Sequence, residues 1–101
     1  SWEGFIIEQI AATAPDRSQF SFYRNSSGNE VDMIVETPKF GTIAFEIKRS
    51  LSPSLSNGTY SALKDISPDK AYVIYSGDDS YRLNEDVTVI PVAGIPSAFE
   101  K

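Results

Sequence analysis

The chain of 101 residues contains no cysteine and no histidine. The lack of cysteine excludes a disulfide framework, a thiol nucleophile and a metal cage built from thiolates. The lack of histidine excludes catalytic triads that use an imidazole, histidine-ligated zinc and the usual general base near neutral pH. Any chemistry must therefore use carboxylates, lysine, arginine, hydroxyl groups or a metal ion held by oxygen atoms.

Long apolar runs are also missing from the sequence. No stretch approaches the ~20 residues of a membrane span, and no signal peptide opens the chain, so we expect a cytoplasmic protein with no membrane partner. The length suits one domain, and the 41% hydrophobic and 23% charged fractions are typical of a folded globular protein. A helical pattern begins at once, without an initiator methionine, which predicts that the chain is a piece of a longer protein.

The charge balance is acidic, with nine basic against fourteen acidic residues and a net charge of −5. This balance argues against a simple electrostatic binder of nucleic acid, which usually has a basic face. It does not exclude a nuclease, because a divalent cation bound by carboxylates inverts the local field.

The first half of the chain has the pattern of a helix followed by a small sheet. An apolar stripe at helical spacing predicts a helix over residues 2–14. Alternating apolar residues and short turns then predict an antiparallel meander. Its three strands are expected over residues 20–24, 30–36 and 42–48. In the second of these strands, Val31, Met33 and Val35 are expected on one face.

The second half has a loop rich in serine and proline over residues 50–58, then a weak helix over 59–66. The order strand, helix, strand after residue 42 predicts a right-handed crossover, which places a strand over 70–75 parallel to the third strand. A strand fragment at 81–83 and a last strand over 86–92 follow, the latter at an edge because Pro91 cannot donate to a ladder. We therefore expect an α/β fold of order αβββαβ plus one strand, with a mixed sheet flanked by helices.

Polar residues on the third strand stand out. Glu46 and Lys48 share one side of it, opposite the apolar side, and a solvated ion pair is the simplest interpretation. Antiparallel pairing can, however, bring Asp32 beside Glu46, and two close carboxylates repel unless a cation lies between them. Lys48 can supply part of that charge and a divalent metal the rest, and magnesium prefers carboxylates and water.

Asp32 followed by Glu46-Ile47-Lys48 resembles the D…(D/E)xK signature of the PD-(D/E)XK nuclease superfamily, whose restriction-endonuclease-like core has a similar αβββαβ order. A wider set of segments resembles a domain of prokaryotic AAA-type ATPases catalogued as domain of unknown function 4143, which lies C-terminal to the ATP-binding part. These segments are residues 2–9, 22–24, 28–32 and 45–48.

The resemblance implies a site for magnesium or manganese. Asp32 and Glu46 would be its ligands, together with the backbone carbonyl of Ile47. Lys48 would orient or activate the attacking water and stabilise negative charge on the phosphate. Arg24 would contact a phosphate, and an ion pair of Arg24 with an acidic neighbour, Glu30 or Asp32, is the alternative.

The superfamily often supplies a further carboxylate from its first helix, and two glutamates are available. On a helical wheel Glu3 falls within the apolar stripe, whereas Glu8 falls on the opposite side. We therefore expect Glu3 to join Asp32 and Glu46 as a metal ligand, and Glu8 to be exposed. The alternative is that Glu3 lies in the first turn and only complements the helix dipole.

Two functions follow from these residues. The first is a single nuclease-like domain, residues 1–101, that hydrolyses phosphodiester bonds with a divalent metal and is attached to the missing N-terminal ATPase portion. The second is a catalytically silent module of the same fold that binds nucleic acid or protein and regulates the ATPase. Intact Asp32, Glu46 and Lys48 favour the first, and the acidic charge favours the second. The chain has no GxxxxGK[ST] run, so it is not itself an ATPase of that type.

Overall fold

The first helix, α1 (Trp2–Thr13), is bounded by local signals in the sequence. In the computed structural model, which describes residues 1–100, the Ser1 hydroxyl accepts a hydrogen bond from the N–H of Gly4 at 3.1 Å and caps the helix. The helix ends at Thr13, and the extended backbone of the next residue, Ala14, suits a residue before proline. The helix predicted over residues 2–14 is therefore confirmed to within one residue.

The strands form one six-stranded sheet in the order β1-β2-β3-β4-β6-β5. Its members are β1 (Gln19–Arg24), β2 (Glu30–Thr37), β3 (Gly41–Lys48), β4 (Lys70–Tyr75), β5 (Tyr81–Arg82) and β6 (Val87–Pro91). The first three strands pair antiparallel, as predicted, and β4 lies parallel to β3 and β6. The expected α/β fold with a mixed sheet is confirmed.

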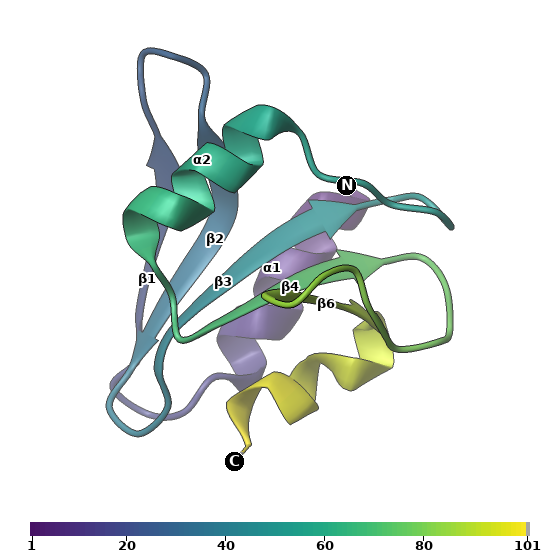
Figure 1. Ribbon diagram of the computed structural model, residues 1–101. Coiled ribbons are helices and arrows are strands. Elements are labelled where there is room, and N and C mark those ends of the chain that lie inside the picture. Colours follow the sequence, from purple (N-terminus) through teal and green to yellow (C-terminus); the bar gives the residue numbers. More distant parts are fainter. Residues whose placement is uncertain (101) are drawn as a thin grey trace.

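Helices cover both faces of this sheet (Figure 1). On one face, α1 and the 3-10 helix η1 (Val92–Phe99) enclose a core that includes Ile10, Phe45 and Phe99. On the other face, α2 (Asn57–Ile66) covers a second core that includes Ala44 and Ala62. None of the helices within residues 1–100 is long and apolar enough to cross a membrane.

Two expectations for the C-terminal part were wrong. The last strand is not an edge strand, because β5 pairs with β6 at Thr88 and Val89 and so covers its outer side. Pro91 is compatible with this position, since the two residues of β5 end before it and no donor is needed there. The strand also ends at Pro91 rather than at residue 92, where η1 begins.

The turn between β2 and β3 depends on Gly41, whose φ of +76° is a conformation that other residues rarely adopt. A Cβ atom at this position would collide with the carboxylate of Asp69. That carboxylate accepts a hydrogen bond from the N–H of Thr42 at 2.8 Å, at the start of β3. The glycine thus allows the segment before β4 to close against the turn.

We predict that Gly41→Ala destabilises the protein by about 2–3 kcal/mol, from left-handed backbone strain plus a disturbed hydrogen bond at Asp69. Gly28→Ala is the matched control, because Gly28 has a similar φ of +83° but an added Cβ would meet no atom of residues 1–100 within 4 Å. That variant should lose only about 1 kcal/mol. Urea unfolding measures both, and equal losses would contradict the role given to Asp69.

Candidate active site

A β-bulge interrupts the sheet at the predicted site. The regular pairing of β2 with β3 runs only as far as Met33 opposite Phe45. On the other side of β2, the register with β1 shifts between Ile34 and Val31, so that Asp32 and Met33 together face one residue of β1. The bulge turns Val31 into the core under α2, so the expectation that it shares a face with Met33 was wrong.

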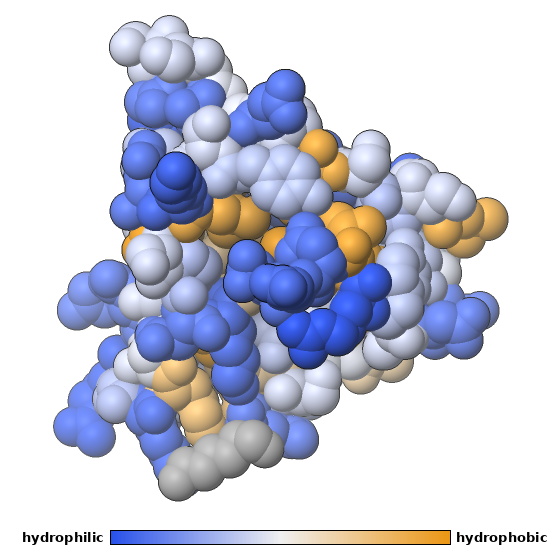
Figure 2. Space-filling view, in the orientation of Figure 1, coloured by the Kyte–Doolittle hydropathy of each residue, from blue (hydrophilic) through white to orange (hydrophobic). Residues whose placement is uncertain are grey.

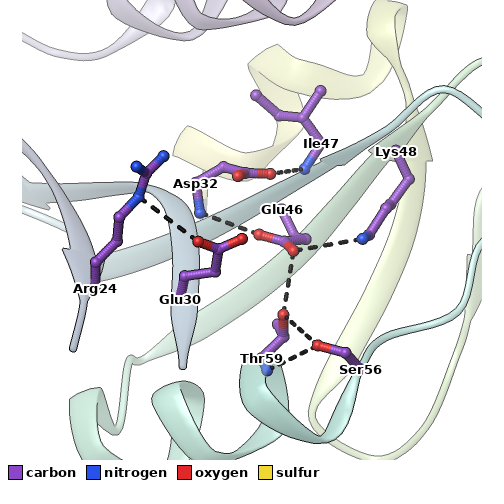
Figure 3. A network of polar contacts seen from close by, with 8 residues as sticks. All are labelled: Arg24, Glu30, Asp32, Glu46, Ile47, Lys48, Ser56 and Thr59. Atoms are coloured by element: carbon purple, nitrogen blue, oxygen red, sulfur yellow. Dashed lines mark hydrogen bonds and ion pairs between the residues drawn. The ribbon is translucent and has the colours of Figure 1, made fainter. Parts of the chain in front are cut away.

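The side chain of Asp32 and the side chain of Glu46 replace the missing ladder bonds (Figure 3). The backbone N–H of Asp32 donates to Oε1 of Glu46 at 3.0 Å. In return, the backbone N–H of Ile47 donates to Oδ2 of Asp32 at 2.8 Å. The structure therefore brings together the two carboxylates that the sequence pairs, each held by the other strand.

The simplest interpretation of the sequence placed Glu46 on a solvated face of the sheet, and this was wrong. The residue is only 7% exposed, because α2 covers this side of β3. Its Oε2 accepts a hydrogen bond from the hydroxyl of Thr59 at 3.2 Å and lies 3.7 Å from Nζ of Lys48. The Lys48 side chain is 37% exposed, so it is partly accessible from solvent.

Burial, together with the negative charge of Asp32, raises the pKa of Glu46 to about 7. The positive charge of Lys48 acts the other way but is the weakest of these influences. A carboxyl group with such a pKa exchanges its proton near neutrality, which is unusual for glutamate and frequent in active sites.

The donor set has the chemistry of a hard-cation site. Two carboxylates and nearby water are the ligands that magnesium takes in proteins. Within residues 1–100, however, no group of three or more acidic side chains is close enough to hold a metal ion together. The pair of Asp32 and Glu46 would thus have to be completed by water and by backbone oxygen, and the family resemblance implies the carbonyl of Ile47.

Glu3 is not brought to this pair. It is exposed in the first turn of α1, as the alternative interpretation had it, and Glu8 is exposed as expected. Trp2, in the same turn, packs against the core whereas Glu3 does not, so the helical wheel alone does not decide which first-turn residues are covered. The fully buried positions of α1 are Ile6 and Ile10, one turn and two turns further along.

Arg24 forms an ion pair with Glu30. Its Nε lies 3.6 Å from Oε2 of Glu30, and both side chains are exposed. The guanidinium group also lies over the ring of Phe22, 5.2 Å from its centroid. The structure therefore agrees with the alternative in which Arg24 forms a surface ion pair.

Sequence reasoning missed the contribution of α2. The helix begins at Asn57, inside the segment expected to be a loop, and Ser56 caps it by accepting from the N–H of Thr59 at 3.1 Å. A serine directly before a helical pattern is a signal for a helix start, because its hydroxyl accepts a backbone N–H of the first turn. That signal would have placed Thr59 in the first turn, over the polar side of β3.

A separate groove of about 760 Å³ lies on the same face as α2 but at the other end of the sheet. It is lined by the end of α2, the start of β4 and the segment before β6, and includes Leu63, Ala71 and Val87. Figure 2 shows this face largely covered by hydrophilic side chains, with apolar atoms visible in the hollows between them. None of the residues predicted for the site lines this groove.

The model of one protein family, described as a domain of unknown function (DUF4143), matches residues 1–95. The chain belongs to this family. Two curated relatives of this DUF4143 domain are an uncharacterized protein of Mycobacterium bovis and one of Mycobacterium tuberculosis, each 34% identical over 91 residues. The match covers 90% of this chain but 20% of each relative, so the chain spans about one fifth of their length. No solved structure matches it.

The raised pKa of Glu46 predicts how the stability of the metal-free domain depends on pH. In the unfolded chain Glu46 has the ordinary carboxyl pKa of 4.5, whereas in the folded domain its pKa is about 7. Between these two pH values the folded domain therefore holds a proton that the unfolded chain has lost. The free energy of unfolding should therefore fall as the pH rises from about 4.5 to 7, by on the order of 3 kcal/mol.

Glu46→Gln cannot ionise and should lack this loss, so its stability relative to wild type should increase across the same pH range. Urea unfolding in the presence of a chelator measures the difference. Glu36→Gln, at an exposed position of the same sheet, is the control and should show no such trend. A constant difference between Glu46→Gln and wild type from pH 5 to 8 would contradict the raised pKa.

Proposed function

We propose that this DUF4143 domain is a divalent-metal-dependent nuclease of the PD-(D/E)XK type, which hydrolyses phosphodiester bonds in DNA or RNA. One observation carries the proposal. Where the regular pairing of β2 with β3 stops, the carboxylates of Asp32 and Glu46 each accept a hydrogen bond from the other strand. The ammonium group of Lys48 lies 3.7 Å from the carboxylate of Glu46. A mixed sheet with helices on both faces, in the expected order, supports it further.

The residues present fit magnesium or manganese. All available donors are oxygen atoms, and the charge of Asp32 raises the pKa of the buried Glu46, a repulsion that a cation between them would relieve. When bound, such a metal supplies a water molecule of lowered pKa and polarises the phosphate.

The chain's own residues would position the carboxylates and contact the phosphate. Asp32 and Glu46 hold their carboxylates at fixed positions, because each accepts a hydrogen bond from the backbone of the neighbouring strand. Lys48, partly exposed beside them, can donate a hydrogen bond to the attacking water or to a phosphate oxygen and stabilise the developing negative charge. Arg24 would contact a phosphate only by leaving Glu30.

We further propose that the domain acts as part of a longer chain that contains an AAA-type ATPase portion. The sequence resemblance to a domain of such ATPases supports this context, and the curated relatives are about five times as long as the matched region. The net charge of −5 favours a role for another part of the chain in bringing nucleic acid to the site.

A catalytically silent module that binds nucleic acid or protein and regulates the ATPase is the second candidate. It is favoured by the edge strand β1, on which Phe20 and Phe22 are 44% and 64% exposed. Exposed aromatic side chains on an unpaired edge suit contact with another polypeptide. In that case Asp32 and Glu46 would serve only to connect β2 to β3.

Metal binding separates these candidates. We predict that manganese, at tenfold excess over its dissociation constant, raises the melting temperature by about 5–10 °C, because it binds the folded state alone. Asp32→Ala should melt at the same temperature with and without manganese. An unchanged wild-type melting temperature at millimolar manganese would leave the silent module as the better candidate.

Cleavage is predicted to depend on Lys48. Lys48→Ala should reduce manganese-dependent cleavage of single- or double-stranded oligonucleotides at least 100-fold, because it removes a charged donor to the phosphate or the water. Calorimetry should show manganese affinity close to that of wild type. Lys64→Ala, which removes a lysine of α2 away from the site, is the matched control and should cleave normally. Cleavage by Lys48→Ala at the wild-type rate would contradict the assignment.

A further inference from the structure

The first turn of α2 presents one buried hydroxyl group to the candidate site. Thr59 is 2% exposed, and its hydroxyl donates to Oε2 of Glu46 at 3.2 Å (Figure 3). A threonine in this position is not required by the helix, because Ser56 already supplies the cap. The hydroxyl of Thr59 is therefore available to donate a hydrogen bond to the carboxylate of Glu46.

The Ser56 hydroxyl lies within hydrogen-bonding distance of the Thr59 hydroxyl. The Ser56 hydroxyl accepts the backbone N–H of Thr59 at 3.1 Å and donates its own hydrogen to Oγ1 of Thr59 at 3.2 Å. A hydroxyl group has a single hydrogen to donate. With Ser56 donating to Thr59, the hydrogen of the Thr59 hydroxyl remains available for Glu46.

The carboxylate of Glu46 is thereby held at both oxygens. Oε1 accepts from the backbone of Asp32, and Oε2 accepts from Thr59. Lys48 is 3.7 Å from Oε2, a longer contact made by a flexible and partly exposed side chain. Thr59 is thus the rigid partner that sets the orientation of Oε2.

We propose that Thr59 is a positioning residue that holds the Glu46 carboxylate in the orientation needed to bind a divalent cation. The inference rests on the proposed metal site and assigns Thr59 a part in it. Partners that orient a metal-binding carboxylate typically contribute 10–100-fold to metal affinity. A purely structural threonine would instead act on the stability of α2 and leave affinity unchanged.

The test is a calorimetric titration with manganese alone, at one pH, on variants whose folding is checked by circular dichroism. Thr59→Val keeps the shape of the side chain and removes the hydroxyl, whereas Thr59→Ser keeps the hydroxyl. Thr37→Val is the matched control. Thr37 is also buried and hydrogen-bonded through its hydroxyl, but it lies at the other end of β2 and contacts Phe40 and Gly41.

We expect Thr59→Val to bind manganese at least 10-fold more weakly, Thr59→Ser to stay within about 3-fold of wild type, and Thr37→Val to bind like wild type. Wild-type affinity in Thr59→Val would overturn the inference. Equal weakening in Thr59→Val and Thr37→Val, or no rescue by serine, would also overturn it, because either result means a structural role.

If the wild-type domain binds no manganese, the proposed function is overturned and this inference with it. If the wild-type domain and Thr59→Val bind manganese equally well, only this inference is rejected.

If Thr59→Val does not fold, Ser56→Gly takes its place, because glycine is tolerated at a helix N-cap. It removes the hydroxyl that orients Thr59 and should weaken manganese binding at least 3-fold. Wild-type affinity in Ser56→Gly would then reject the inference.

Discussion

Two backbone N–H groups in the middle of the sheet depend on carboxylates rather than on the backbone of a neighbouring strand. Regular pairing of β2 with β3 stops at Met33 and Phe45, next to the bulge in β2. The side chains of Glu46 and Asp32 accept the hydrogens of Asp32 and Ile47 instead. A buried N–H without an acceptor costs about 1–3 kcal/mol. The carboxylates therefore satisfy the two N–H groups at the junction between β2 and β3.

The topology of the sheet then determines which element covers the carboxylate of Glu46. Because β4 lies parallel to β3, the chain must leave the end of β3, cross one face of the sheet and return, and α2 makes that crossing. The crossing begins near the polar end of β3, so the N-terminal turn of α2 lies over Glu46. The partial positive charge of a helix N-terminus favours an anionic neighbour at this place. Thr59 contacts Glu46 as a consequence of the connection as well as of its own residue type.

Local periodicity was sufficient to predict α1, the meander, the parallel crossover and the meeting of Asp32 with Glu46. It failed where the outcome depends on residues far apart in the sequence. Alternation along β2 gives no sign of the bulge that moves Val31 to the other face, and Pro91 gives no sign of the short strand that covers β6. For Glu3, the helical wheel gave a face of α1, but Trp2 rather than Glu3 packs against the core in the first turn, which the wheel alone does not decide.

The energetics of Glu46 bear on whether this junction is only structural. An exposed ion pair of glutamate and lysine contributes less than about 1 kcal/mol, and such a pair needs no burial. Here the glutamate is buried beside a second carboxylate, which raises its pKa to about 7 and makes its ionised form unfavourable. At position 44 of the same strand, alanine fills the equivalent side of the sheet without this penalty. A bound cation would relieve the repulsion between these two close carboxylates, and this supports the metal-dependent proposal over a purely structural role.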